Sequence, residues 1–309
     1  MFVFEVLLPL IFIVAVGFLS TKKGFFSQQF VAEISKFVLY VSLPAVIISS
    51  LSSIELGQVI QVNFMLVYAI AGLSAMTVAI LVSKGLLKFT WTESFINGLG
   101  SGMPNSAFVG FPVVLSLYDG QFIEAFLMCV LIENLVFIPL SLISLEFAQG
   151  RSSSISEQLK IVAGRISRNP IILAISFALV VNITGIRLPE FVTEGVSIFA
   201  KTSVALALFA IGGALGQSLK FEQFRRIAFV TSMKLVFFPL VVVALLMTLP
   251  VEGDLKYVLL IFAASPMLSI YPILGGLYQQ QRFCLNTLII TTVASGLSLS
   301  VVIAITTSS

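Results

Sequence analysis

Two ionisable side chains lie deep within apolar stretches of the chain. Glu133 falls near the middle of the apolar run 122–147, and Lys234 lies a few residues from the middle of the run 227–249. A charge at the centre of a bilayer costs about 2.5–3.5 kcal/mol on insertion scales, so such a residue usually has a partner or a function. Glu133 is therefore a candidate proton carrier, and Lys234 a candidate partner for Glu133 or for an anion. A structural ion pair or hydrogen-bond anchor would explain Glu133 as well, and Lys234 could instead extend its amine to the membrane surface.

Two further stretches combine polar residues with helix breakers. Four glycines and two prolines crowd the sixteen residues from Asn97 to Pro112, and Pro266 and Pro272 lie six residues apart in a second apolar run. Such residues disfavour a continuous helix, and each backbone group left unsatisfied in hydrocarbon costs several kcal/mol. A broken helix is stable there if it is buried in protein, lines a wet cavity or holds a ligand. Its free N–H groups suit an anion and its freed carbonyls suit a small cation. Kinks that merely permit close helix packing are the alternative.

The composition indicates which elements must position these residues. Of the 309 residues, 58% are hydrophobic and only 10% are charged, against about 25% charged in an ordinary soluble domain. The absence of histidine excludes Ser-His-Asp triads and His-ligated metal sites. Cys129 and Cys284 lie in apolar runs and are expected to be core thiols. We therefore expect a membrane protein that is not an enzyme, contacts the lipid bilayer and binds no nucleic acid.

Ten apolar runs are long enough to cross a bilayer as helices, for which about 20 residues are needed. They do not alternate between apolar and polar residues, so an all-α protein is expected and a β-barrel is not. The runs are Phe2–Ser20, Ile34–Leu51, Asn63–Ser83, Glu93–Tyr118, Phe122–Phe147, Pro170–Ile186, Val196–Leu215, Ile227–Leu249, Leu255–Gln279 and Leu285–Thr306.

The lysines and arginines predict the orientation. If ten runs cross, thirteen of the seventeen basic residues fall on one side, and only Arg187, Lys201 and Lys256 fall on the other, with Lys234 inside a run. Basic residues mark the cytoplasmic side. The expected location is the inner (plasma) membrane, with multiple spans and both termini extracytoplasmic.

The two broken stretches also resemble each other. The segment 111–118, FPVVLSLY, aligns without a gap on 271–278, YPILGGLY. Each lies in the fourth run of a five-run half, 1–150 and 151–309, and an odd number of spans per half places the halves in opposite orientations. The sequence thus predicts two inverted five-helix repeats, with the fourth and ninth helices broken. Paired breaks of this kind are typical of a transporter binding site.

The stretch from Pro104 to Pro112, PNSAFVGFP, resembles the auxin efflux carrier family of bacterial permeases, whose fourth span has an Asn followed by an aromatic-x-Gly-x-Pro pattern. The Ser265-Pro266 and Tyr271-Pro272 pairs, the first apolar run and the ten-run length are similar too. The resemblance implies a secondary carrier in which the broken helices cross between a scaffold bundle and a moving core. Its substrates would be carboxylates, such as malonate or other dicarboxylates. The chain departs from the pattern at Met267 and Leu268, where relatives place a polar residue, and a homodimer is expected from the resemblance alone.

These observations predict a secondary active transporter of a small mono- or dicarboxylate that works by alternating access, driven by H⁺ or Na⁺ and without a cofactor. A sodium-coupled bile-acid-type symporter for a bulkier anion is one alternative, and a non-transporting membrane receptor is another. Glu133 and Lys234 are the predicted ion-coupling residues. The predicted substrate-binding residues are Pro104, Asn105, Ser106, Pro112, Ser265, Pro266, Ser269, Tyr271 and Pro272.

Overall fold

A computed structural model describes residues 2–51, 60–149, 164, 167–186, 188–216 and 223–308. Helices cover each of the ten apolar runs, and the described residues form no strand beyond one isolated bridge. Six helices are long and apolar enough to cross a membrane, and four shorter apolar helices accompany them in the described part of the chain. The described part of the chain is therefore all-α, as the continuous apolar runs predicted. The arrangement of ten spans as an inverted repeat stays a prediction.

The chain divides into two compact units that do not follow the predicted halves. Unit 1 comprises 1–61, 107–127 and 164–218, and unit 2 comprises 62–106, 128–163 and 219–309. Each unit therefore draws on both halves of the sequence. The predicted boundary between residues 150 and 151 lies outside the described residues.

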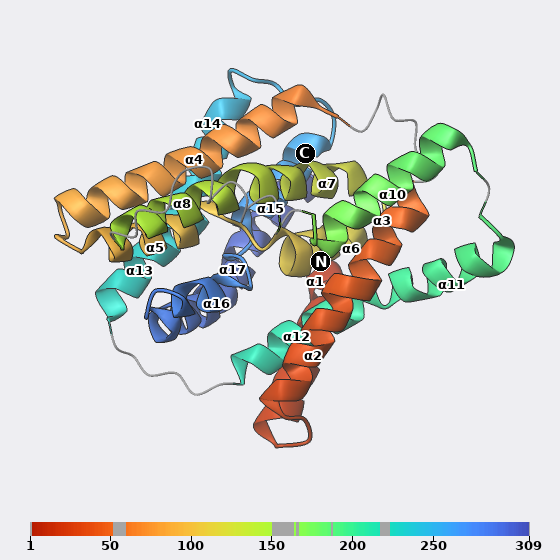
Figure 1. The fold of residues 1–309 in the computed structure, drawn as a ribbon, viewed down its shortest axis with the longest axis horizontal. Helices are drawn as coiled ribbons and strands as arrows, with labels where there is room; N and C mark the ends of the chain where they lie inside the picture. Colours follow the sequence, from red (N-terminus) through yellow and green to blue (C-terminus); the bar gives the residue numbers. More distant parts are fainter. Residues whose placement is uncertain are drawn as a thin grey trace. The chain divides into compact units, whose positions relative to one another are not determined.

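Unit 1 contains the first two and the sixth and seventh apolar runs, together with the chain after the first break. Helix α1 packs against α12, and α3 packs against α10 and α11, while α2 lies beside α12 (Figure 1). Its helices are α1 (Phe2–Lys22), α2 (Gln28–Phe37), η1 (Val38–Ser42), α3 (Leu43–Leu51), α6 (Phe111–Leu117), α10 (Pro170–Thr184), α11 (Glu190–Lys201) and α12 (Ser203–Leu215).

Unit 2 contains most of the remaining runs. Helix α4 packs against α5 and α14, and α15 packs against α14 and α17. Its helices are α4 (Val62–Gly85), α5 (Trp91–Gly102), η4 (Glu133–Phe137), α8 (Ile138–Ala148), α13 (Phe224–Ser232), η5 (Met233–Phe237), α14 (Phe238–Leu246), α15 (Leu255–Ala264), α16 (Tyr271–Gly276) and α17 (Gln281–Ser308). Two elements span the division of the units: η3 (Ser106–Gly110) and α7 (Ile123–Ile132).

Prolines account for the π-helical turns in these helices. Each of the four described π segments, η1, η3, η4 and η5, is followed at the second residue of the next helix by a proline: Pro44, Pro112, Pro139 and Pro239. A proline lacks the N–H for the helical bond and its ring crowds the carbonyl four residues earlier. A wider π turn relieves that crowding without ending the helix. Glu133 and Lys234 both lie in such turns.

Two glycines bring the backbones of α1 and α12 into contact within unit 1. A Cβ added to Gly17 would overlap the carbonyl oxygen of Phe209, and one added to Gly212 would overlap that of Val14. Small residues permit this close approach in membrane helices, where packing rather than water exclusion drives association.

We therefore expect Gly212→Ala to lower the midpoint of thermal unfolding in detergent by about 3–6 °C, because the new methyl group must push α1 away from α12. Gly195→Ala in α11 is the matched control, since its Cβ would meet no atom within 4 Å. The control should leave the midpoint unchanged or raise it. An equal effect of the two variants would show that the α1–α12 contact contributes no stability.

Candidate functional site

The two predicted helix breaks meet in unit 2. Helix α5 ends at Gly102 and α15 ends at Ala264, and the extended segments that follow pair as a short antiparallel bridge between Pro104 and Met267. The N–H of Asn105 donates to the carbonyl of Pro266 at 2.7 Å, and the N–H of Leu268 donates to the carbonyl of Met103 at 3.1 Å. Each break thus satisfies backbone groups that the other leaves free, which is what a buried non-helical segment requires.

A polar side-chain pair lies beside this crossing. The amide of Asn105 donates to the hydroxyl of Ser269 at 2.7 Å, and Asn105 is only 4% exposed. The two residues come from opposite breaks, so the pair links the crossing segments through side chains as well as backbone. An amide and a hydroxyl together offer donors and acceptors to a polar ligand.

Glu133 contacts the chain directly beside the crossing. The hydroxyl of Tyr68 donates to Glu133 Oε1 at 2.5 Å, and the hydroxyl of Ser106, the residue after Asn105, donates to the same oxygen. Tyr68 is fully buried, with the rings of Phe64, Phe137 and Phe238 around it. The carboxyl group is therefore held in a fixed position by hydroxyl groups from α4 and from the start of η3.

Lys234 lies at the other break. Its Nζ donates to the carbonyl of Ala263 at 2.7 Å and sits 4.5 Å from the centroid of the Phe238 ring, with the side chain fully buried. Lys234 and Glu133 form no ion pair within 4 Å. The ammonium group therefore interacts with the end of α15 and is enclosed within the protein.

The remaining predicted site residues mostly shape the helix ends. The hydroxyl of Ser265 donates to the carbonyl of Ile261 at 2.8 Å, and Pro272 lies in the first turn of α16. The hydroxyl of Tyr271 donates to the carbonyl of Ile96 at 3.0 Å, which ties α16 to α5. Pro112 lies in the first turn of α6, in unit 1. Of all the predicted substrate-binding residues, Pro104, Asn105, Pro266 and Ser269 belong to the crossing.

Two residues of unit 2 were not singled out from the sequence. Tyr68 is one of several hydroxyl-bearing residues in the apolar run Asn63–Ser83, and its partner Glu133 lies 65 positions away. Arg226 was counted only for topology, yet it is 3% exposed. Its guanidinium donates to Asn97 Oδ1 at 2.8 Å and to Gln280 Oε1 at 2.9 Å. A polar group inside an apolar run was the sequence signal that could have identified Tyr68. No such signal exists for Arg226, because whether a residue at the end of a run is buried depends on tertiary packing.

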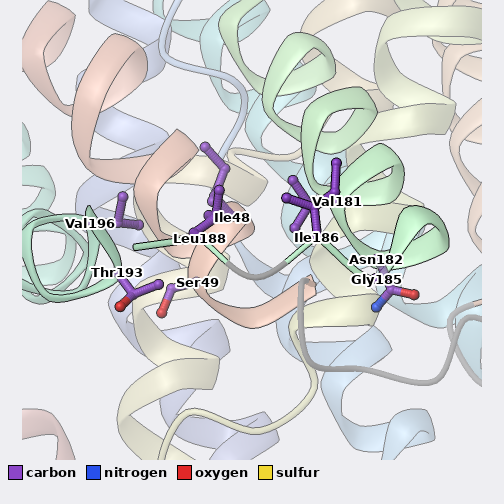
Figure 2. A pocket seen from close by; sticks show the side chains of 9 residues that line it. All are labelled: Ile48, Ser49, Val181, Asn182, Gly185, Ile186, Leu188, Thr193 and Val196. Carbon is purple, nitrogen blue, oxygen red and sulfur yellow. The ribbon is translucent and has the colours of Figure 1, made fainter. Parts of the chain in front are cut away.

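A separate cavity of 460 Å³ lies in unit 1, and Figure 2 shows its lining side chains, which come from α3, α10, α11 and the chain between α10 and α11. Most of the lining residues are aliphatic, with Ser49, Asn182 and Thr193 as the polar ones, and none of the described lining residues is charged. None of the predicted site residues lines it. We therefore place the candidate site at the crossing in unit 2, where polar groups and two ionisable residues converge.

Comparison with known proteins places the chain in a family. The family model described as membrane transport protein matches residues 2–303. The chain is 24% identical over 294 residues to "Uncharacterized transporter YfdV" of Escherichia coli (strain K12), covering 91% of this chain and 88% of that protein. It is 23% identical over 300 residues to "Uncharacterized transporter MJ1031" of Methanocaldococcus jannaschii, covering 94% of each. The family match across almost the whole chain confirms the resemblance inferred from the PNSAFVGFP stretch, and the chain belongs to the membrane transport protein family, the auxin efflux carrier family, as a multi-pass membrane protein.

Proposed function

We propose that this protein is a secondary active transporter of a small organic anion, a mono- or dicarboxylate such as malonate, and that the anion binds at the crossing of the two broken helices. The observation that carries the proposal is the pairing of the two breaks through backbone hydrogen bonds, with the Asn105–Ser269 pair beside them. Interrupted backbone inside a membrane protein persists where it is buried or lines a binding site. An anion that displaced Ser269 from Asn105 would gain an amide donor and free the hydroxyl as a second donor.

The charges around the crossing support a coupled anion carrier. The carboxyl group of Glu133 can bind and release a proton, and it lies beside the crossing because its partner Ser106 is the residue that follows Asn105. Lys234 supplies a positive charge beside the second break, which offsets the cost of bringing an anion into this region. Coupling to H⁺ at Glu133 and coupling to Na⁺ at freed carbonyls are the two mechanisms that the proposal includes.

The composition of the units supports alternating access by two inverted repeats. Unit 1 takes the first and second runs of the first half and the corresponding sixth and seventh runs of the second half. Unit 2 takes the third and most of the fifth run together with their counterparts, the eighth and tenth. Equivalent helices from these four pairs of runs thus join the same unit, as expected if one bundle moves against the other, whereas the fourth run is divided between the units and the ninth lies in unit 2. We further propose the inner (plasma) membrane as the location, with both termini extracytoplasmic.

Uptake of labelled malonate into proteoliposomes, under imposed pH or Na⁺ gradients, tests the proposal. Asn105→Ala is expected to lower the initial rate by about 10-fold or more, since a hydrogen bond to a charged group contributes about 1.5–3 kcal/mol. Asn63→Ala is the matched control, because Asn63 donates to the carbonyl of Pro250 at 2.8 Å in an exposed position. The control should stay within about twofold of the wild type.

Two outcomes would contradict the proposal at different levels. If Asn105→Ala transports at the wild-type rate, the site lies elsewhere in the protein. If the wild type accumulates neither malonate nor other small carboxylates under any gradient, the assignment as a carboxylate carrier is wrong. Both conclusions require that equal amounts of folded protein are reconstituted, which gel filtration of each variant checks.

A further inference from the structure

We infer that the ammonium group of Lys234 is a fixed cation at the C-terminal end of α15, in the place where a sodium-coupled carrier would bind its ion, and that the carrier is independent of sodium. The inference rests on the proposed function, because sodium independence matters only if the protein is a coupled carrier. Of the two coupling ions that the proposed function includes, it selects H⁺. Its structural basis is the complete pairing of the carbonyl groups at the end of α15.

A helix leaves its last four carbonyl groups without helical partners, and at depth each needs another donor. In α15 these are the carbonyls of residues 261–264. The N–H of Ser265 donates to those of Ile261 and Phe262 at 3.1 and 3.3 Å. Lys234 Nζ donates to the carbonyl of Ala263 at 2.7 Å, and the hydroxyl of Ser298 donates to that of Ala264 at 2.8 Å. Every terminal carbonyl of this helix therefore has a donor.

The only charged donor of this set is Lys234. The C-terminal end of a helix carries a partial negative charge of roughly half an electron, which favours a cation. The Phe238 ring, 4.5 Å from Nζ, presents a second negative surface to the ammonium group. Freed carbonyls at a broken membrane helix are the ligands that carriers use for Na⁺. Here the lysine provides the charge and the donor that the ion would otherwise provide.

The first break has an acidic side chain beside it, at the opposite kind of helix end. Ser106 is the first residue of η3, and its hydroxyl donates to the carboxyl group of Glu133. A carboxylate is favoured at the beginning of a helix for the same reason that a cation is favoured at the end. The two breaks are thus each matched by one ionisable side chain from a neighbouring helix, and a free Na⁺ at α15 would add a second positive charge beside Lys234.

Thermal unfolding of the purified protein in detergent, in sodium chloride and in choline chloride at equal ionic strength, tests the inference. The wild type should unfold at the same temperature in both salts. Lys234→Ala removes the fixed charge and exposes the carbonyl of Ala263, so Na⁺ can bind there. This variant should unfold at a lower temperature than the wild type in choline and regain about 3 °C or more in sodium. Lys256→Ala, at the start of α15, is the matched control and should show no difference between the salts.

Three outcomes would overturn the inference: selective stabilisation of the wild type by sodium, a Lys234→Ala variant that gains no more from sodium than the wild type does, or an equal gain for Lys256→Ala. If Lys234→Ala yields no folded protein in either salt, the wild-type comparison decides, and uptake that continues unchanged when choline replaces sodium supports the inference. The unfolding assay contains no substrate. Its failure would leave carboxylate transport standing, and a lack of malonate uptake would leave the assignment of Lys234 standing.

Discussion

Replacing Glu133 with Gln is expected to abolish the acceleration of substrate uptake by an inward proton gradient, lowering the gradient-driven rate by about 10-fold or more. The amide has nearly the size of the protonated carboxyl group and can still accept from Tyr68 and Ser106, so the local packing is kept. It cannot release or take up a proton. Exchange of labelled for unlabelled substrate across the membrane, which needs no net proton movement, should therefore continue at a rate close to that of the wild type.

The exchange measurement separates a coupling role from a structural one. If Glu133 served only to anchor hydrogen bonds, Glu133→Gln would affect driven uptake and exchange alike or neither. Glu146→Gln is the matched control in the same run of helix, where Glu146 accepts a hydrogen bond from Tyr278 at 2.8 Å. The control should keep its response to the proton gradient. A Glu133→Gln variant that retains the full response would exclude Glu133 as the proton carrier.

The sequence predicted those features of the site that depend on local chemistry. Pro104 and Pro266 cannot donate a backbone N–H, so the break in each helix follows from residue type alone. Glu133 and Lys234 stood out because a charge in an apolar run is costly wherever the run lies in the fold. The internal similarity of 111–118 and 271–278 then indicated that the two breaks are equivalent. The structure places the two breaks in direct contact in unit 2.

The pairings of individual side chains could not be predicted in the same way. Ser106 and Ser269 look alike in the sequence, yet one donates to Glu133 and the other accepts from Asn105. Which partner a serine reaches depends on the rotation of each helix about its axis, and an apolar run with no polar face carries little information about that rotation. For the same reason the role of Tyr68 could not be predicted, because its hydroxyl group contacts Glu133 only when α4 packs beside η4.

The division into compact units was also beyond the sequence. The similarity of the two halves suggested a boundary near residue 150, because a repeat is read along the chain. The structure groups the helices by packing instead, and both units draw on both halves. A repeat along the sequence and a compact unit need not coincide, since each half of this sequence supplies helices to both units.

Arg226 is expected to dominate the stability of unit 2, and Arg226→Ala should lower the unfolding midpoint in detergent by about 10 °C or more. The guanidinium connects three separate parts of the chain: Asn97 in α5, Gln223 before α13, and Gln280 before α17. It also pairs with Glu93 at 3.4 Å and stacks 3.7 Å from the centroid of the Phe283 ring. Its removal leaves the buried Asn97 Oδ1 without its guanidinium donor and breaks the pair with Glu93, and breaking a buried pair from one side costs about 3–5 kcal/mol.

Arg225→Ala provides the matched control, because the neighbouring arginine is exposed and its loss should change stability by no more than about 0.5 kcal/mol. Equal unfolding midpoints for the two variants would show that the Arg226 network adds no stability. A lysine at this position supplies one compact charge, whereas the planar guanidinium reaches several acceptors at once. Arg226→Lys should therefore recover only part of the stability that Arg226→Ala loses.

Because Asn97 lies in the helix that leads into the first break and Gln280 follows the helix after the second, this one side chain fixes both broken segments at their outer ends. Stability lost at Arg226 should therefore be accompanied by slower uptake, even though the arginine lies outside the crossing.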